Sequence, residues 1–146
     1  MELTVNNHSD YSVKEQEVKK FCQQLAGENE MDLPDEISVV FVDDEEITRL
    51  NEKYYNRSGI TDVLAFDYGE DLAEIILNPS QHQRQAKRFS NSFSEEVAEN
   101  IIHAFLHISG YDHTREDNQQ LHLEKQKKLM EKYKKESIPE LIENFA

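Results

Sequence analysis

The segment SFSEEVAENIIHAFLHISG, Ser92 to Gly110, decides the fold because it predicts a central helix. Ser92 and Glu95 have the spacing of a capping box, which satisfies backbone N–H groups at a helix start. Gly110 suits the left-handed residue that follows many helix ends. Between these signals the apolar residues form two helical stripes, so we expect the helix to be buried nearly all round. The stripes comprise Val97, Ile101, Phe105 and Ile108, together with Ile102 and Leu106.

One row of this helix is polar. His103 and His107 are four residues apart and therefore project side by side, and Glu96 and Asn100 continue the row. Polar side chains on an otherwise buried helix need hydrogen-bond or metal partners. This row is therefore the first candidate for a functional site.

A third histidine, His113, follows shortly after His103 and His107. Because Gly110 lets the chain reverse, His113 can return toward the other two. Three imidazoles suit a catalytic zinc ion, which keeps a fourth position for water, whereas structural zinc usually has four protein ligands. The only thiol, Cys22, is far away in sequence. We predict one zinc ion per chain on the three histidines, although nickel, copper or iron also suit imidazoles and the histidines could instead be hydrogen-bonded core residues.

The residue after the first histidine bears on the reaction class. Zinc peptidases of one large group carry H-E-x-x-H, in which the Glu acts as the base. This chain has Ala104 in place of that Glu. Because alanine cannot accept a proton, a metallopeptidase is the weaker alternative.

Patterns outside the central helix predict a single α+β domain over residues 1–146. The β-branched run Ile37–Val42 is typical of a buried strand. The other expected strands are Glu2–Val5, Thr61–Tyr68 and Glu74–Leu77, and the other expected helices are Ser12–Leu25, Asp43–Tyr55, Gln81–Arg88 and Thr114–Tyr133. This order predicts one small mixed sheet covered by helices, with the metal-bearing helix at the centre.

The composition limits the partners and the compartment. The net charge is −14, which disfavours nonspecific binding to nucleic acid, since that affinity comes mainly from phosphate contacts. The single cysteine excludes an internal disulfide. The first residues have neither the basic start nor the apolar core of a signal peptide, and no apolar run has membrane-spanning length. We therefore expect a cytoplasmic protein with no membrane and no DNA partner.

Two blocks carry a family resemblance. HAFLHISGYDH, from His103 to His113, resembles the signature H-x-x-L-H-x-x-G-Y-D-H of the YbeY family of bacterial rRNA maturation factors. LNEKYYNRSGITDVLAFDY, from Leu50 to Tyr68, resembles the family's L-N, Arg and T-D-V-L-S-F block, and the order of elements matches along nearly the whole chain. The departures are Ala104 for Gly, Ala73-Glu74 for Gly-Asp, and Ala65 and Asp67 for Ser and Pro. They concern the shape of the cleft and not the metal ligands.

The resemblance implies a zinc-dependent endoribonuclease specific for single-stranded RNA. It would act in maturation of small-subunit (16S) rRNA and in late ribosome quality control, with the ribosome as partner. By the resemblance His103, His107 and His113 are the ligands, and Arg57 matches the family's cleft arginine. The hypothesis is that zinc activates water while Arg57 binds phosphate through its planar guanidinium. The alternatives are a ribosome assembly factor with mainly structural zinc and the metallopeptidase.

Two acidic residues are candidates for a supporting role. Asp112 adjoins a predicted ligand and could orient a histidine, or it could simply close the turn after Gly110. Asp62 begins an expected strand, where bonding to the turn is the ordinary role of an Asp. Both are expected to support the site rather than to react.

Overall fold

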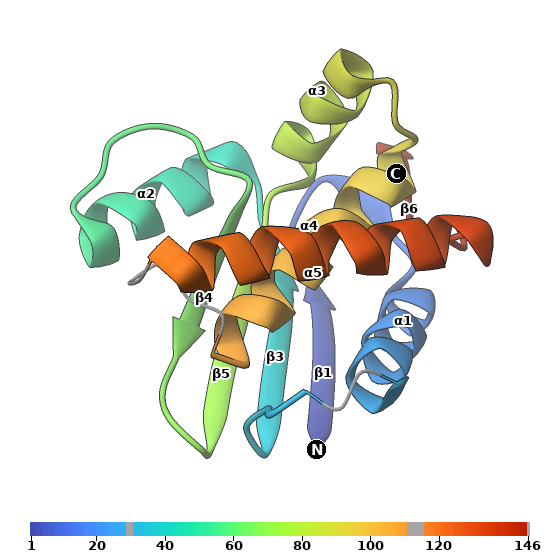
Figure 1. Ribbon diagram of the computed structural model, residues 1–146. Coiled ribbons are helices and arrows are strands. Elements are labelled where there is room, and N and C mark those ends of the chain that lie inside the picture. Colours follow the sequence, from blue (N-terminus) through green and yellow to red (C-terminus); the bar gives the residue numbers. More distant parts are fainter. Residues whose placement is uncertain (29–30, 111–115, 146) are drawn as a thin grey trace.

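The computed structural model of the protein describes residues 1–28, 31–110 and 116–145 (Figure 1). The strands are β1 (Glu2–Asn7), β2 (Tyr11–Val13), β3 (Glu36–Phe41), β4 (Val63–Asp67), β5 (Leu72–Leu77) and β6 (Ile142–Phe145). The helices are α1 (Glu15–Glu28), α2 (Asp44–Tyr55), α3 (Pro79–Phe89), α4 (Phe93–Ile108) and α5 (Glu116–Lys135). No helix within these ranges is both long enough and apolar enough to span a bilayer.

The main sheet is mixed, as the sequence predicts. In the described ranges its strand order is β1-β3-β5-β4, with β1, β3 and β5 parallel and β4 antiparallel to β5. The antiparallel pair is a hairpin whose turn contains Gly69 at φ 97°, a conformation that glycine adopts without strain. Strand β1 lies at one edge of the sheet, and its range contains the expected strand Glu2–Val5.

Helices cover the two faces of the sheet unequally (Figure 1). On one face Ile37, Val39 and Phe41 of β3 are completely buried in the main core, which α1, α4 and α5 complete. On the other face a smaller core joins Ile47 of α2 to Ile76 of β5 and their apolar neighbours. The predicted α+β fold class is therefore confirmed.

Helix α4 lies between the sheet and α5 (Figure 1). The hydroxyl of Ser92 accepts a hydrogen bond from the backbone N–H of Glu95, and the Glu95 carboxylate accepts one from the N–H of Ser92, at 3.0 and 2.8 Å. Gly110 has φ 108°, the left-handed value expected after the helix. Ile101, Phe105 and the other residues of both apolar stripes are buried, because the helix meets apolar neighbours on opposite sides.

A second, two-stranded sheet was not predicted, so the expectation of one sheet is wrong. Strands β2 and β6 pair antiparallel, and the pairing continues in the hydrogen bond from the Lys14 N–H to the Leu141 carbonyl. The N–H of Leu141 also donates to the Ser94 hydroxyl of α4 at 2.9 Å. Strand β2 is too short for a visible two-residue period, and it occupies residues that we assigned to the start of a helix.

Two described histidines outside the central helix, His82 and His122, are deeply buried. His82 of α3 is fully buried, and its Nε2 lies 3.0 Å from the backbone carbonyl of Asp62. A carbonyl oxygen only accepts, so Nε2 carries the proton. Burial lowers the pKa of His82 to about 4, against the opposing effect of the Asp62 charge. The imidazole therefore stays neutral in the folded protein at moderately acidic pH.

This burial predicts a pH dependence of stability. Because the folded pKa lies below the ordinary value of 6.5, the unfolded chain binds an extra proton between pH 6.5 and about 4. The contribution of His82 to the free energy of unfolding is complete above pH 6.5 and is lost as the pH falls to 4. Its size is about 1.4 kcal/mol for each unit by which the pKa is lowered. Urea unfolding from pH 7 to 4.5 should show a shallower loss for His82→Gln than for wild type. The exposed His8→Gln is the control, and an unchanged slope in His82→Gln would assign the acid sensitivity to other groups.

Candidate functional site

A cleft of about 660 Å³ lies where three parts of the fold meet. One wall comes from the end of α2 and the loop after it, a second from β4, and the third from the C-terminal half of α4. Arg57, His103 and His107 all line this cleft. The structure thus brings together three residues that the sequence proposed for one site from two separate motifs.

The loop after α2 fixes where Arg57 sits. Asn56 ends the helix in the left-handed conformation at φ 51°, and the N–H of Arg57 donates to the Asn51 carbonyl at 3.4 Å. The hydroxyl of Tyr55 donates to the Ala65 carbonyl of β4 at 2.8 Å. These contacts fasten the end of α2 to the adjacent strand, so the exposed Arg57 follows at the edge of the cleft.

Arg57 differs from its neighbours in its ion pairing. Arg49 is paired with Glu46 at 2.7 Å, and Arg84 is paired with Asp44 at 2.8 Å. Among the described residues no carboxylate lies within salt-bridge distance of the Arg57 guanidinium. A guanidinium with this freedom, facing a cleft, can bind an anion through two parallel hydrogen bonds.

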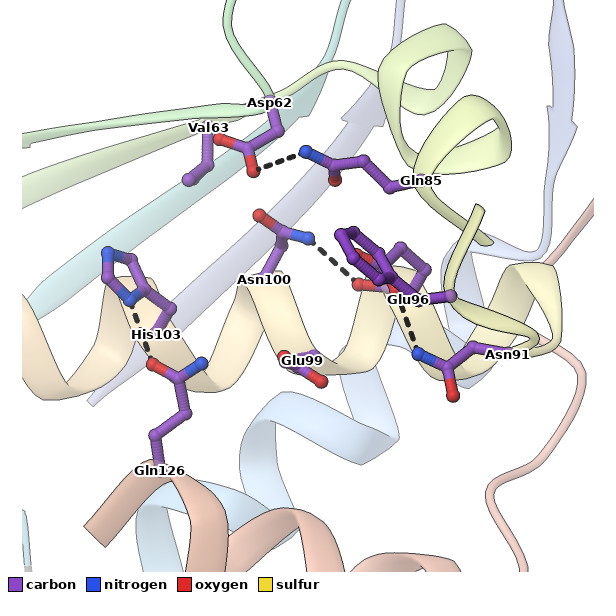
Figure 2. Close-up of a pocket in the computed structure, with 10 residues that line it drawn as sticks. Asp62, Val63, Gln85, Asn91, Glu96, Glu99, Asn100, His103 and Gln126 are labelled. Atoms are coloured by element: carbon purple, nitrogen blue, oxygen red, sulfur yellow. Dashed lines mark hydrogen bonds between the residues drawn. The ribbon is translucent and has the colours of Figure 1, made fainter. Parts of the chain in front are cut away.

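His103 is oriented by α5. Its Nδ1 lies 2.8 Å from Oε1 of Gln126, and Figure 2 shows this contact reaching across from the neighbouring helix. Because an amide oxygen only accepts, Nδ1 carries the proton, which leaves Nε2 with its lone pair. The ring also packs against the buried His122, with 4.5 Å between ring centroids.

Gln126 and His122 were missed by the sequence reasoning. They are four residues apart on α5 and therefore face the same way, toward the polar row of α4. That spacing is the signal that could have identified them. It was hidden because α5 is polar along most of its length, so that its buried side could not be read from the sequence.

The predicted metal ligands are only partly described. His103 and His107 lie one turn apart and share the cleft, as two ligands of one ion must, while His113 and Asp112 lie outside the described residues. Within the described ranges no three His, Cys, Asp or Glu side chains gather closely enough to hold a metal. The donor chemistry nevertheless fits a metal, since Nε2 of His103 is unprotonated and Nδ1 has the acceptor that oriented ligands have.

Asp62 lies beside the site rather than in it. Its carboxylate accepts a hydrogen bond from the side chain of Gln85 at 3.1 Å, and its carbonyl accepts from the backbone N–H of Asn78 and from His82. Asp62 lines a second pocket, which contains His103 but not Arg57. Asp62 therefore bonds to residues of α3 and to Asn78 just before it, which are distant in sequence, and not to its own turn.

Comparison with known proteins matches the chain to one family. The family model described as "Endoribonuclease YbeY" matches residues 4–134. This range includes all of α2, β4 and α4, which form the walls of the cleft.

Individual relatives agree with the family match. The chain is 39% identical over 110 residues to Endoribonuclease YbeY of Thermosipho melanesiensis, covering 73% of this chain and 80% of that one. It is 32% identical over 133 residues to Endoribonuclease YbeY of Bacillus velezensis, covering 81% and 85%. The solution structure of TM1509 from Thermotoga maritima superposes with a TM-score of 0.63 at 28% identity, covering 88% and 87% of the two chains.

The contact between α5 and His103 predicts a measurable tautomer. Nitrogen-15 NMR of the imidazoles at pH 8 should find the His103 proton on Nδ1 in the metal-free wild type. Gln126→Leu removes the acceptor, so a mixture of tautomers should appear. Gln120→Leu, an exposed residue on the same helix, is the matched control. A pure Nδ1–H tautomer in Gln126→Leu would show that another group orients the ring.

Proposed function

The chain belongs to the YbeY family of endoribonucleases, and on this premise we propose that it cleaves single-stranded RNA in a zinc-dependent reaction. RNA cleavage makes it a hydrolase of the nuclease class. The proposed substrate is small-subunit (16S) rRNA during maturation and in late quality control of the ribosome, in the cytoplasm.

The cleft supports this proposal because it places an arginine opposite two histidines. Arg57 stands on the α2–β4 side, while His103 and His107 project from α4. A phosphodiester group between them would meet the planar guanidinium on one side and the imidazole row on the other. Binding the phosphate through Arg57 would position the scissile bond and stabilise charge that develops on the phosphate oxygens.

We propose that His103, His107 and His113 hold the zinc ion. When bound, zinc would supply a Lewis acid for the phosphoryl group and make water more acidic. Gln126 contributes by keeping the proton of His103 on Nδ1, so that Nε2 remains a donor. The position of Ala104 in the cleft leaves no carboxylate where a zinc peptidase has its base.

A catalytic zinc is favoured over a structural one by the size of the core. The main core contains the apolar faces of α1, α4 and α5 together with the sheet, and it forms without any contribution from the histidine row. Proteins that depend on structural zinc usually lack such a core. Zinc is therefore expected to serve the reaction more than the fold.

Because the chain is strongly acidic, we expect it to attract RNA only at a small part of its surface, the cleft. With a net charge of −14, the chain as a whole repels phosphate, and Arg49 and Arg84 are already paired with carboxylates. Weak and salt-sensitive RNA binding is the physical expectation, so guidance by the ribosome would supply the remaining affinity.

Arg57 gives the sharpest test of phosphate binding. Arg57→Ala should reduce cleavage of single-stranded RNA about 100-fold or more, as loss of a charge-stabilising donor does, while the zinc content stays the same. The matched control is Arg49→Ala, which removes an exposed arginine outside the cleft. Normal cleavage by Arg57→Ala would make Arg57 an ordinary surface residue.

The metal is tested by His107→Ala and by chelation. The variant should lose bound zinc in elemental analysis and lose RNA cleavage, whereas His8→Ala, at an exposed position, should keep both. Removal of zinc from wild type should leave the far-ultraviolet circular dichroism unchanged, because the core is independent of the site. Unfolding on chelation would instead support a structural zinc in an assembly factor.

A further inference from the structure

A second pocket of about 380 Å³ adjoins the cleft and shares His103 and Val63 with it. Figure 2 shows its floor, where the side chains of Glu96, Asn100 and His103 rise from α4 toward Asp62 and Gln85. Apart from His103 and Gln126, the residues that line this pocket have no role in the phosphate and metal binding proposed above. Its chemistry differs from that of the cleft, because none of the described residues that line it is an arginine or a lysine.

The deepest polar groups of the pocket present oxygen atoms. Glu96 and Asn100 are each only 6% exposed. The Nδ2 of Asn91 donates to Oε2 of Glu96 at 3.2 Å, and the Nδ2 of Asn100 donates to the Glu96 carbonyl at 3.0 Å. One N–H of each amide is therefore used within the protein. No hydrogen bond within the described residues reaches the side-chain oxygen of Asn100, which points into the pocket (Figure 2).

On the opposite wall of the pocket, too, an amide donates to a carboxylate or carbonyl and leaves its own oxygen without a partner. The Nε2 of Gln85 donates to the carboxylate of Asp62 at 3.1 Å, and the buried Oε1 of Gln85 has no partner in the described part of the chain. Buried polar atoms are normally satisfied, so an unsatisfied acceptor beside a cavity indicates a missing donor. Burial also raises the pKa of Glu96, because desolvation disfavours the charged carboxylate.

The ligand must therefore offer N–H donors and carry no negative charge. Asp62, Glu96 and Glu99 line the pocket, so a phosphate group would be repelled. The ligand should also have a flat apolar face, since Phe89 lines the pocket and is 59% exposed. Exposed aromatic rings of this kind stack on bases in proteins that bind single-stranded RNA.

We propose that this pocket binds a guanine base of the RNA, next to the phosphate held at Arg57, and so determines where the RNA is cut. Guanine presents N1–H and the 2-amino group side by side, a pair of donors that matches the Glu96 carboxylate and the Asn100 oxygen. Adenine and cytosine each present one amino group beside an acceptor, and uracil presents one N–H between two acceptors. The proposal rests on the proposed ribonuclease activity, because it names the base preference of the same site.

The first experiment measures base preference in cleavage. Single-stranded RNAs that differ at one position should be cut about tenfold faster with guanosine than with inosine, which lacks only the 2-amino group and so one hydrogen bond to a charged acceptor. Glu96→Gln replaces the acceptor pair by an amide and should reduce the ratio of the two rates to near one. Glu131→Gln, an exposed residue of α5, is the matched control and should keep the ratio. Equal cleavage of all four bases by wild type would overturn the proposal and leave the ribonuclease function standing.

The second experiment measures binding without cleavage. Titration with guanosine should shift the side-chain amide NMR signals of Asn100, Asn91 and Gln85, and inosine should bind about tenfold more weakly. If the protein binds guanosine but cuts no RNA, the proposed base pocket stands and only the proposed nuclease activity is overturned. If Mn²⁺ alone shifts these signals and guanosine does not, the pocket is a cation site and the proposal fails. Because these measurements use only the wild-type protein, their outcome does not depend on whether a variant folds.

Discussion

The burial of α4 on two opposite sides is the constraint on which the rest of the structure depends. The sheet packs against one stripe of the helix and α5 against the other, so nearly every apolar side chain has a fixed place. A rotation of the helix by one residue would turn an imidazole into the core and an isoleucine into the cleft. The desolvation of a polar group opposes such a rotation, and the position of the polar row is therefore determined by the packing of everything around it.

The central helix and the main sheet could be predicted because their signals are local. The capping box at Ser92, the β-branched run of β3 and the hairpin glycine each act within a few residues. The gathering of Arg57 with His103 and His107 was also expected, although it came from the family resemblance and not from any periodicity. The metal-ligand roles of His103, His107 and His113 and the supporting role of Asp112 stay predictions.

What the sequence did not reveal depends on contacts between distant residues. The pairing of β2 with β6 and the contact of Gln126 with His103 join segments that give no sign of each other. Contacts between distant residues can also change the role of a side chain whose position was predicted correctly. Asp43, the first residue of the expected helix, stands at the N-cap of α2, but its side chain makes no capping bond and instead accepts a hydrogen bond from the N–H of Asp10. Local rules predict which residue stands at a helix end, and tertiary contacts decide what its side chain does there.

The small second sheet has a consequence for the order in which the molecule is completed. Strand β6 follows every residue of the cleft in the chain, yet it pairs with β2, which precedes α1. The residue before β6, Leu141, donates a hydrogen bond to Ser94 at the start of α4. Contacts between such distant segments form late in folding, because a long loop must close first. A nascent chain can therefore carry every residue of the cleft while the helix that holds two of them still lacks its final support. The cleft would then gain this support only after β6 has been synthesised.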